Sequence, residues 1–186
     1  MKYYVLDPGP LAAPSGATQY PVTLLVGRIS ASRLFQDDRI VYGSGPVQLG
    51  TFSYDRWAEP PAGMIQDLLI AALRSSGQYR AVSPIGSNVR GDYVVRGRLW
   101  DMSEVDQPEL MARFSFQVEL FDPKSHTTVW STRYEHDEPA QGKTVKDVVE
   151  AMDKNVRAGM QQITSGLSEY FASHPVEQPQ PQPSGN

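Results

Sequence analysis

Paired carboxylates are the side chains of this sequence with the clearest potential for catalysis, because two of them can act as general acid and base, as in glycoside hydrolysis. The candidates are Asp37 with Asp38, Asp55 with Glu59, and Glu135 with Asp137 and Glu138. All stand beside predicted turns or helix starts, where carboxylates accept backbone hydrogen bonds or offset the helix dipole. Structural roles are therefore favoured, and no catalytic pair is assigned.

The three histidines are not expected to form a metal or catalytic site. His126 falls in a predicted hairpin turn, His136 in an acidic segment, and His174 at the start of a Pro-rich tail. A zinc site needs three or four convergent ligands. The sequence also lacks a Gly-x-Ser-x-Gly elbow, a phosphate loop ending in Lys-Ser/Thr, and any cysteine. We predict that the protein is not an enzyme and needs no metal or cofactor.

The composition favours one domain with an ordinary surface. A chain of 186 residues, 40% of them hydrophobic, is long enough for one core. The formal charge of -4 makes nucleic acid an unsuitable partner. No apolar run approaches the roughly 18 residues of a membrane span. We predict a domain over residues 1–173 and a disordered Pro/Gln-rich tail over 174–186.

The apolar periodicity predicts two helices and several short strands. One helix covers 64–73 and ends before Gly77; the other begins after Thr144, an N-cap with Asp147 three residues on, and continues to about Phe171. The predicted strands are 3–6, 22–29, 39–42, 47–52, 79–82, 92–100, 111–121 and 127–134. The last three, with short connections, indicate an antiparallel meander. The predicted fold is α+β: a mostly antiparallel sheet with two helices packed on it, in a single domain.

The segment Asp55-Arg56-Trp57-Ala58-Glu59 joins a predicted strand to a predicted helix. Its Arg, Trp and Glu residues are not needed for the turn between them and should have a packing or binding role. In one interpretation the Trp57 ring is buried and Arg56 pairs with Asp55 or Glu59. In the other these residues belong to a protein-binding surface, since Trp, Tyr and Arg dominate interface hot spots. By contrast, Trp100 and Trp130 lie in alternating strands and are expected in the core. The candidate partner-binding residues are Arg39, Tyr42, Tyr54, Arg56, Trp57 and Glu59.

Three segments occur in a recognisable order: Tyr3-Tyr4-Val5-Leu6, Arg39-Ile40-Val41-Tyr42 and 55–59. In this order and spacing the chain resembles, from about residue 3 to 171, the ABC-type transport auxiliary lipoproteins. These are accessory components of lipid transporters built around MCE-domain proteins, the paraquat-inducible type among them. Members usually begin with a secretion signal and a lipidated Cys. This sequence starts with Met1-Lys2 and has no Cys, so it looks like a soluble mature segment with a new start.

The resemblance implies a non-catalytic accessory component that faces the periplasm, is tethered at the outer membrane by an N-terminal lipid, and docks on an MCE-domain protein. It also leaves room for a homo-oligomer. An alternative is a periplasmic carrier that holds a lipid or another apolar ligand between sheet and helices. A hydrolase with dispersed carboxylates is the third and least favoured hypothesis.

Overall fold

The computed structural model describes residues 1–7, 9–10, 18–43, 47–106 and 108–176. In this part of the chain, nine strands form one sheet. The strands are β1 (Lys2–Tyr4), β2 (Tyr20–Val26), β3 (Ser30–Ala31), β4 (Arg39–Gly43), β5 (Leu49–Trp57), β6 (Tyr79–Pro84), β7 (Tyr93–Val105), β8 (Met111–Asp122) and β9 (Thr127–Pro139). The helices are η1 (Arg33–Phe35), α1 (Pro61–Ser75) and α2 (Val145–Ser173). Most of the predicted tail lies outside the described residues.

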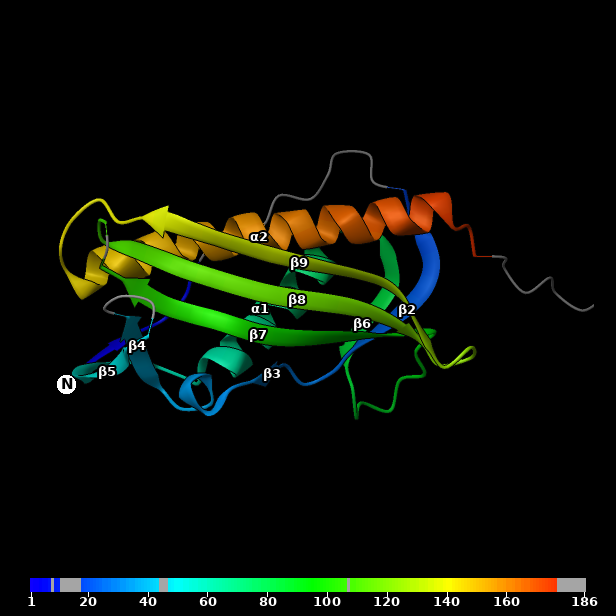
Figure 1. The fold of residues 1–186 in the computed structure, drawn as a ribbon. Coiled ribbons are helices and arrows are strands. Elements are labelled where there is room, and N and C mark those ends of the chain that lie inside the picture. Colours follow the sequence, from blue (N-terminus) through cyan, green and yellow to red (C-terminus); the bar gives the residue numbers. More distant parts are fainter. Residues whose placement is uncertain (8, 11–17, 44–46, 107, 177–186) are drawn as a thin grey trace, which may run out of the picture.

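Strand β7 is the axis of the sheet (Figure 1). One of its edges pairs with β8 along almost its whole length, and β8 pairs in turn with β9, which confirms the predicted antiparallel meander. The other edge of β7 pairs successively with β2, β3 and β4, all in parallel. Strand β6 flanks β2, whereas β5 and then β1 flank β4.

The prediction of a mostly antiparallel sheet is wrong. Among the described strands, the pairs β1–β5, β2–β6, β2–β7, β3–β7 and β4–β7 are parallel. Only β4–β5, β7–β8 and β8–β9 are antiparallel. Parallel neighbours need long connections, which leave no hairpin signal in the sequence. The sheet is therefore mixed and mostly parallel in its pairings.

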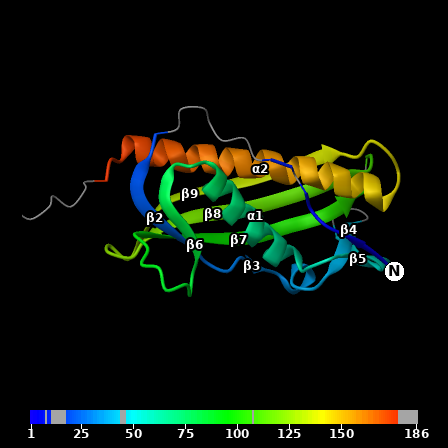
Figure 2. The ribbon, with the colours of Figure 1, turned by 180° about the vertical axis from the view of Figure 1, so that it is seen from behind.

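Both helices pack on one face of the sheet. Figure 1 views the strands with the helices behind them, and Figure 2 shows α1 in front of the sheet. Helix α2 contacts β8 and β9, and α1 contacts β6, β7 and α2. Thr144 caps α2 as predicted: its Oγ1 accepts from the Asp147 backbone N–H, and Asp147 accepts from the Thr144 backbone N–H in return. The prediction of one domain with two helices on a sheet is confirmed.

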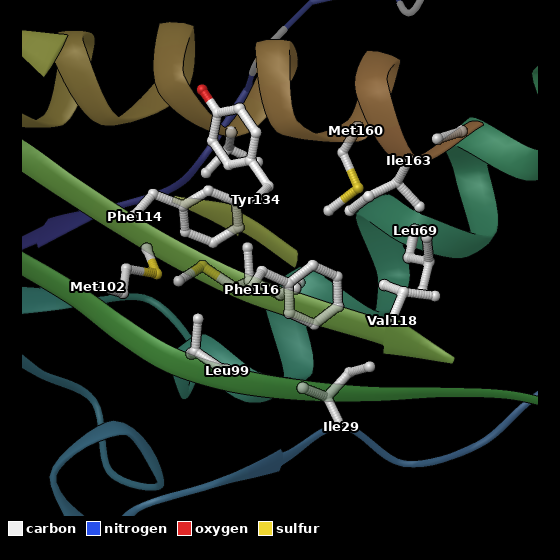
Figure 3. Packing of buried hydrophobic residues seen from close by; sticks show 14 of the residues in the cluster. Ile29, Leu69, Leu99, Met102, Phe114, Phe116, Val118, Tyr134, Met160 and Ile163 are labelled. Carbon is white, nitrogen blue, oxygen red and sulfur yellow. The ribbon is translucent and has the colours of Figure 1, made fainter. Parts of the chain in front are cut away.

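The core lies between the sheet and the helices, where side chains fill the space (Figure 3). Phe114, Phe116 and Val118 of β8 point to one face and are fully buried against Met160 and Ile163 of α2 (Figure 3). No helix in the described ranges is long and apolar enough to cross a membrane.

The N-terminal segment also contacts α2, through Asp153. The backbone N–H of Asp7 donates to Asp153 Oδ1 at 2.8 Å. Burial raises the pKa of Asp153 to about 6; the charges of Asp7 and Glu150 act in the same direction, while the Asp7 N–H and Arg157 oppose the shift.

Replacing Asp153 with asparagine should stabilise the protein at neutral pH. The pKa of Asp153 is about 6 in the folded protein and 3.8 in an unperturbed side chain. Because the folded state binds this proton more tightly, the contribution of Asp153 to stability falls as the pH rises from 3.8 to about 6. Asparagine can still accept the Asp7 N–H. We expect a gain on the order of 1 kcal/mol, reduced by solvent screening of this half-buried group. Urea unfolding above and below the window measures it. A gain equal at both pH values would contradict the titration of Asp153.

Candidate functional site

The six candidate residues lie at one end of the sheet, around strands β4 and β5. Arg39 and Tyr42 belong to β4, while Tyr54, Arg56 and Trp57 belong to β5. Glu59 follows in the short link between β5 and α1. The sequence predicted a strand over 47–52, but β5 continues to Trp57, and Lys2–Tyr4 pair with its residues 55–57.

The structure divides the six residues into an exposed and an internal group. Tyr54 is 73% exposed, Tyr42 is 37% exposed, and Arg39 and Glu59 are also exposed. Trp57, in contrast, is only 2% exposed, and Arg56 is partly buried. The burial of Trp57 agrees with the structural interpretation of this residue. The exposed residues are the ones that a partner could contact in the folded protein.

Asp38 holds the internal group in place. Its side-chain Oδ1 accepts from Arg56 Nη1 at 2.7 Å, and its backbone carbonyl accepts from the Trp57 N–H at 2.7 Å. The predicted pairing of Arg56 with Asp55 or Glu59 is therefore wrong. Asp55 instead accepts a hydrogen bond from Tyr4 Oη at 3.0 Å. This arrangement follows from the strand pairing, which brings residues of β1 and the segment before β4 next to the end of β5.

Apolar side chains extend the exposed group along the β4–β5 hairpin. The rings of Tyr42 and Phe52 are 4.9 Å apart. Gly50, opposite Tyr42 in the ladder, leaves room for its ring, because a Cβ at this position would lie 2.5 Å from Tyr42 Cζ. We define the corner surface as six exposed residues of β4, β5 and the segments that flank β5: Arg39, Tyr42, Val47, Leu49, Tyr54 and Glu59. Leu49 pairs with Gly43, next to the Tyr42–Gly50 pair, so its side chain projects from the opposite face to Tyr42. The corner surface combines aromatic, aliphatic and charged groups, as protein interfaces do.

The helix-free face of β7, β8 and β9 carries a second group of polar residues. Arg113 forms two hydrogen bonds with Asp137, at 2.8 and 2.7 Å, and thereby lowers the pKa of that carboxyl. Arg133 contacts Glu135 at 2.7 Å and Ser115. The Arg113–Asp137 pair joins β8 to β9, and the Arg133–Glu135 pair lies along β9. Both occupy carboxylates that the sequence offered as acid–base candidates.

Trp100 lies on this helix-free face and is 41% exposed, so the expectation that it belongs to the core is wrong. The β7–β8 register shifts between Leu99 and Asp101, which makes Trp100 the extra residue of a β-bulge. Its indole N–H donates to Gln117 Oε1 at 3.2 Å. Trp130 is partly buried and packs against the core. Trp100 is in phase with Arg96 and Arg98, so the alternation along β7 places it on this face; the prediction was wrong because it assigned a large aromatic residue to the core by its type.

His136 and His174 have local partners. His136 Nε2 lies 3.3 Å from Glu138 Oε2, and His174 follows the last turn of α2, where its ring stacks on Tyr170. His126 occupies a turn with a positive φ of 56°. Across the described residues, no three His, Asp or Glu side chains gather closely enough to hold a metal ion.

A family model for the ABC-type transport auxiliary lipoprotein component matches residues 4–164. Comparison with curated proteins gives no match. Among solved structures, protein XCC0632 from Xanthomonas campestris is similar with a TM-score of 0.86 and 19% identity, over 94% of this chain and 98% of that one. The hypothetical protein CT253 from Chlamydia trachomatis has a TM-score of 0.58 and 8% identity, over 82% and 99%. At these identities the two structures support the fold alone.

Proposed function

Because the chain belongs to the ABC-type transport auxiliary lipoprotein component family, we propose that it is a non-catalytic accessory subunit that docks on a transporter. In this proposal the transporter is a lipid-transport system built around an MCE-domain protein. The subunit faces the periplasm and is held at the outer membrane by a lipid on its N-terminal side. The observation that carries the docking role is the corner surface, whose apolar and charged side chains are exposed at one end of the sheet.

Two features of the corner surface support this role. Tyr42, Tyr54 and Arg39 are residue types that contribute most to protein interfaces, because they combine a large contact area with hydrogen-bonding groups. Their backbone is held by β4 and β5, so a partner would meet a largely pre-formed surface. The adjacent strand β1 also places the N-terminal end at this end of the sheet (Figure 2). A lipid anchor on that side would keep the corner surface near the membrane.

The double variant Arg39→Glu with Tyr54→Ser should lose association with the transporter partner. Within the described part of the chain, Arg39 forms an ion pair with the exposed Asp37, and exposed pairs contribute little to stability. Tyr54 is the most exposed aromatic residue of the surface. We expect partner recovery from envelope extract by crosslinking and co-purification to fall roughly tenfold or more.

The matched control is Arg80→Glu in β6, at the other side of the sheet, which should co-purify as the unmodified protein does. Circular dichroism checks that each variant is folded. Arg56 is left unchanged because its contact with Asp38 connects two segments of the fold. Undiminished recovery of the folded double variant would remove the corner surface from the proposal. Failure to recover any MCE-domain protein would remove the proposed function itself.

The carrier hypothesis makes a different prediction. A carrier would retain its lipid through purification, so native mass spectrometry would find bound phospholipid at near-unit stoichiometry. An accessory docking subunit would be observed without ligand. The packed side chains between sheet and helices favour the docking role, since a carrier needs space at that position (Figure 3).

A further inference from the structure

A cavity of about 330 Å³ opens on the helix-free face of the sheet, away from the corner surface. This volume is within the range of small-molecule sites, which begins at roughly 300 Å³. Its lining comes from β3, β7 and β8: Ser30, Arg96, Gly97, Arg98, Trp100, Gln117 and Glu119.

Two arginines of β7 define the chemistry of the cavity. Arg96 and Arg98 are two residues apart on one strand, so both side chains project from the same face. The Arg96 guanidinium lies 3.7 Å from the centre of the Phe121 ring, and the Arg98 guanidinium lies 4.1 Å from that of Trp100. Stacking holds a guanidinium by its flat face and leaves the N–H groups at its edge available to a ligand.

The charges of Arg96 and Arg98 are not neutralised by an ion pair within the described residues. Their neighbours on the same face differ: Arg113 pairs with Asp137, and Arg133 pairs with Glu135. Glu119 stands opposite Arg96 in the ladder, yet its carboxylate accepts from Gln117 Nε2 at 3.0 Å. With two arginines and one carboxylate in its lining, the cavity has a net positive charge.

We propose that this cavity binds a phosphate group through Arg96 and Arg98. Each guanidinium presents parallel N–H donors that match two phosphate oxygens, and charge-assisted hydrogen bonds of this kind are roughly twice as strong as those between neutral groups. Ser30 and Trp100 also line the cavity, and the Ser30 hydroxyl donates to the Gly97 carbonyl at 3.3 Å. A free phosphate-bearing molecule and a phospholipid headgroup share this chemistry. The proposal is independent of the corner surface and of the transporter assigned to it.

Calorimetric titration with inorganic phosphate and co-sedimentation with vesicles distinguish the two sources. The vesicles are phosphatidylglycerol, whose phosphate is accessible and anionic, and phosphatidylcholine as reference. The variant Arg96→Gln with Arg98→Gln should lose affinity by roughly tenfold or more, because it removes charge-assisted hydrogen bonds. The charge-matched control, Arg80→Gln with Arg90→Gln, changes two exposed arginines elsewhere.

The site binds a free phosphate compound if the protein binds inorganic phosphate but not vesicles, and if the Arg96/Arg98 variant loses this binding while the control keeps it. Phosphatidylglycerol binding with the same pattern supports it with a lipid headgroup. The proposal is overturned if the unmodified protein binds neither probe. It is equally overturned if the Arg96/Arg98 variant binds as well as the unmodified protein, or if the control loses as much affinity.

Discussion

Replacing Trp57 with alanine should lower the free energy of unfolding by about 3–5 kcal/mol, the range for truncation of a buried aromatic side chain. The ring is 2% exposed and belongs to the main hydrophobic core. The residue also ends β5, where its N–H bonds to Asp38 and its backbone pairs with Tyr4. Loss of the ring would leave a cavity beneath the junction between this strand and α1. Urea unfolding followed by circular dichroism measures the change.

A second tryptophan provides the control. Trp100→Ala removes a ring of the same size from the exposed face and should cost much less, because little of the cavity term applies. Trp57→Phe should retain most of the stability. The indole Nε1 of Trp57 is buried and has no hydrogen-bond partner in the described structure, so phenylalanine loses no bond there. If the Trp57→Ala protein kept full stability but no longer bound the transporter partner, Trp57 would be an interface residue instead.

Replacing Asn155 with leucine should also destabilise the protein strongly, by about 3 kcal/mol or more. Asn155 is 0% exposed in the middle of α2. Its Nδ2 donates to the carbonyl oxygens of Ala112 and His136, each at 2.8 Å, and its Oδ1 accepts from Tyr134 Oη at 2.8 Å. Leucine has a similar size but leaves these groups buried without their partner, and each such group costs roughly 1–3 kcal/mol.

Two variants test whether the loss comes from this network. Tyr134→Phe removes one of its hydrogen bonds and should cost about 1 kcal/mol. Gln161→Leu makes the corresponding change at an exposed position of α2 and should be nearly neutral. An Asn155→Leu protein as stable as the unmodified one would show that the hydrogen bonds only balance the cost of burying the amide.

The two helices and the meander could be predicted because their signals are local. The core face of α2 follows from apolar residues three and four positions apart, and its start from Thr144 and Asp147. The alternation in β8 predicted correctly that Phe114, Phe116 and Val118 are buried. The resemblance in three short segments identified the family that the family model shows.

The sequence by itself therefore determined the helices, the meander and the family, since each depends on residues close together in the chain. Only the tertiary structure decided the parallel pairing of β2, β3 and β4 along β7, the pairing of Arg56 with Asp38, and the exposure of Trp100. The physical reason is that strand direction and ion pairing depend on residues distant in sequence, and which face of a sheet the helices cover is decided by how the whole chain packs. The sequence likewise did not distinguish Arg96 and Arg98 from other charged residues. The structure shows that both line a cavity on the face of the sheet that no helix covers.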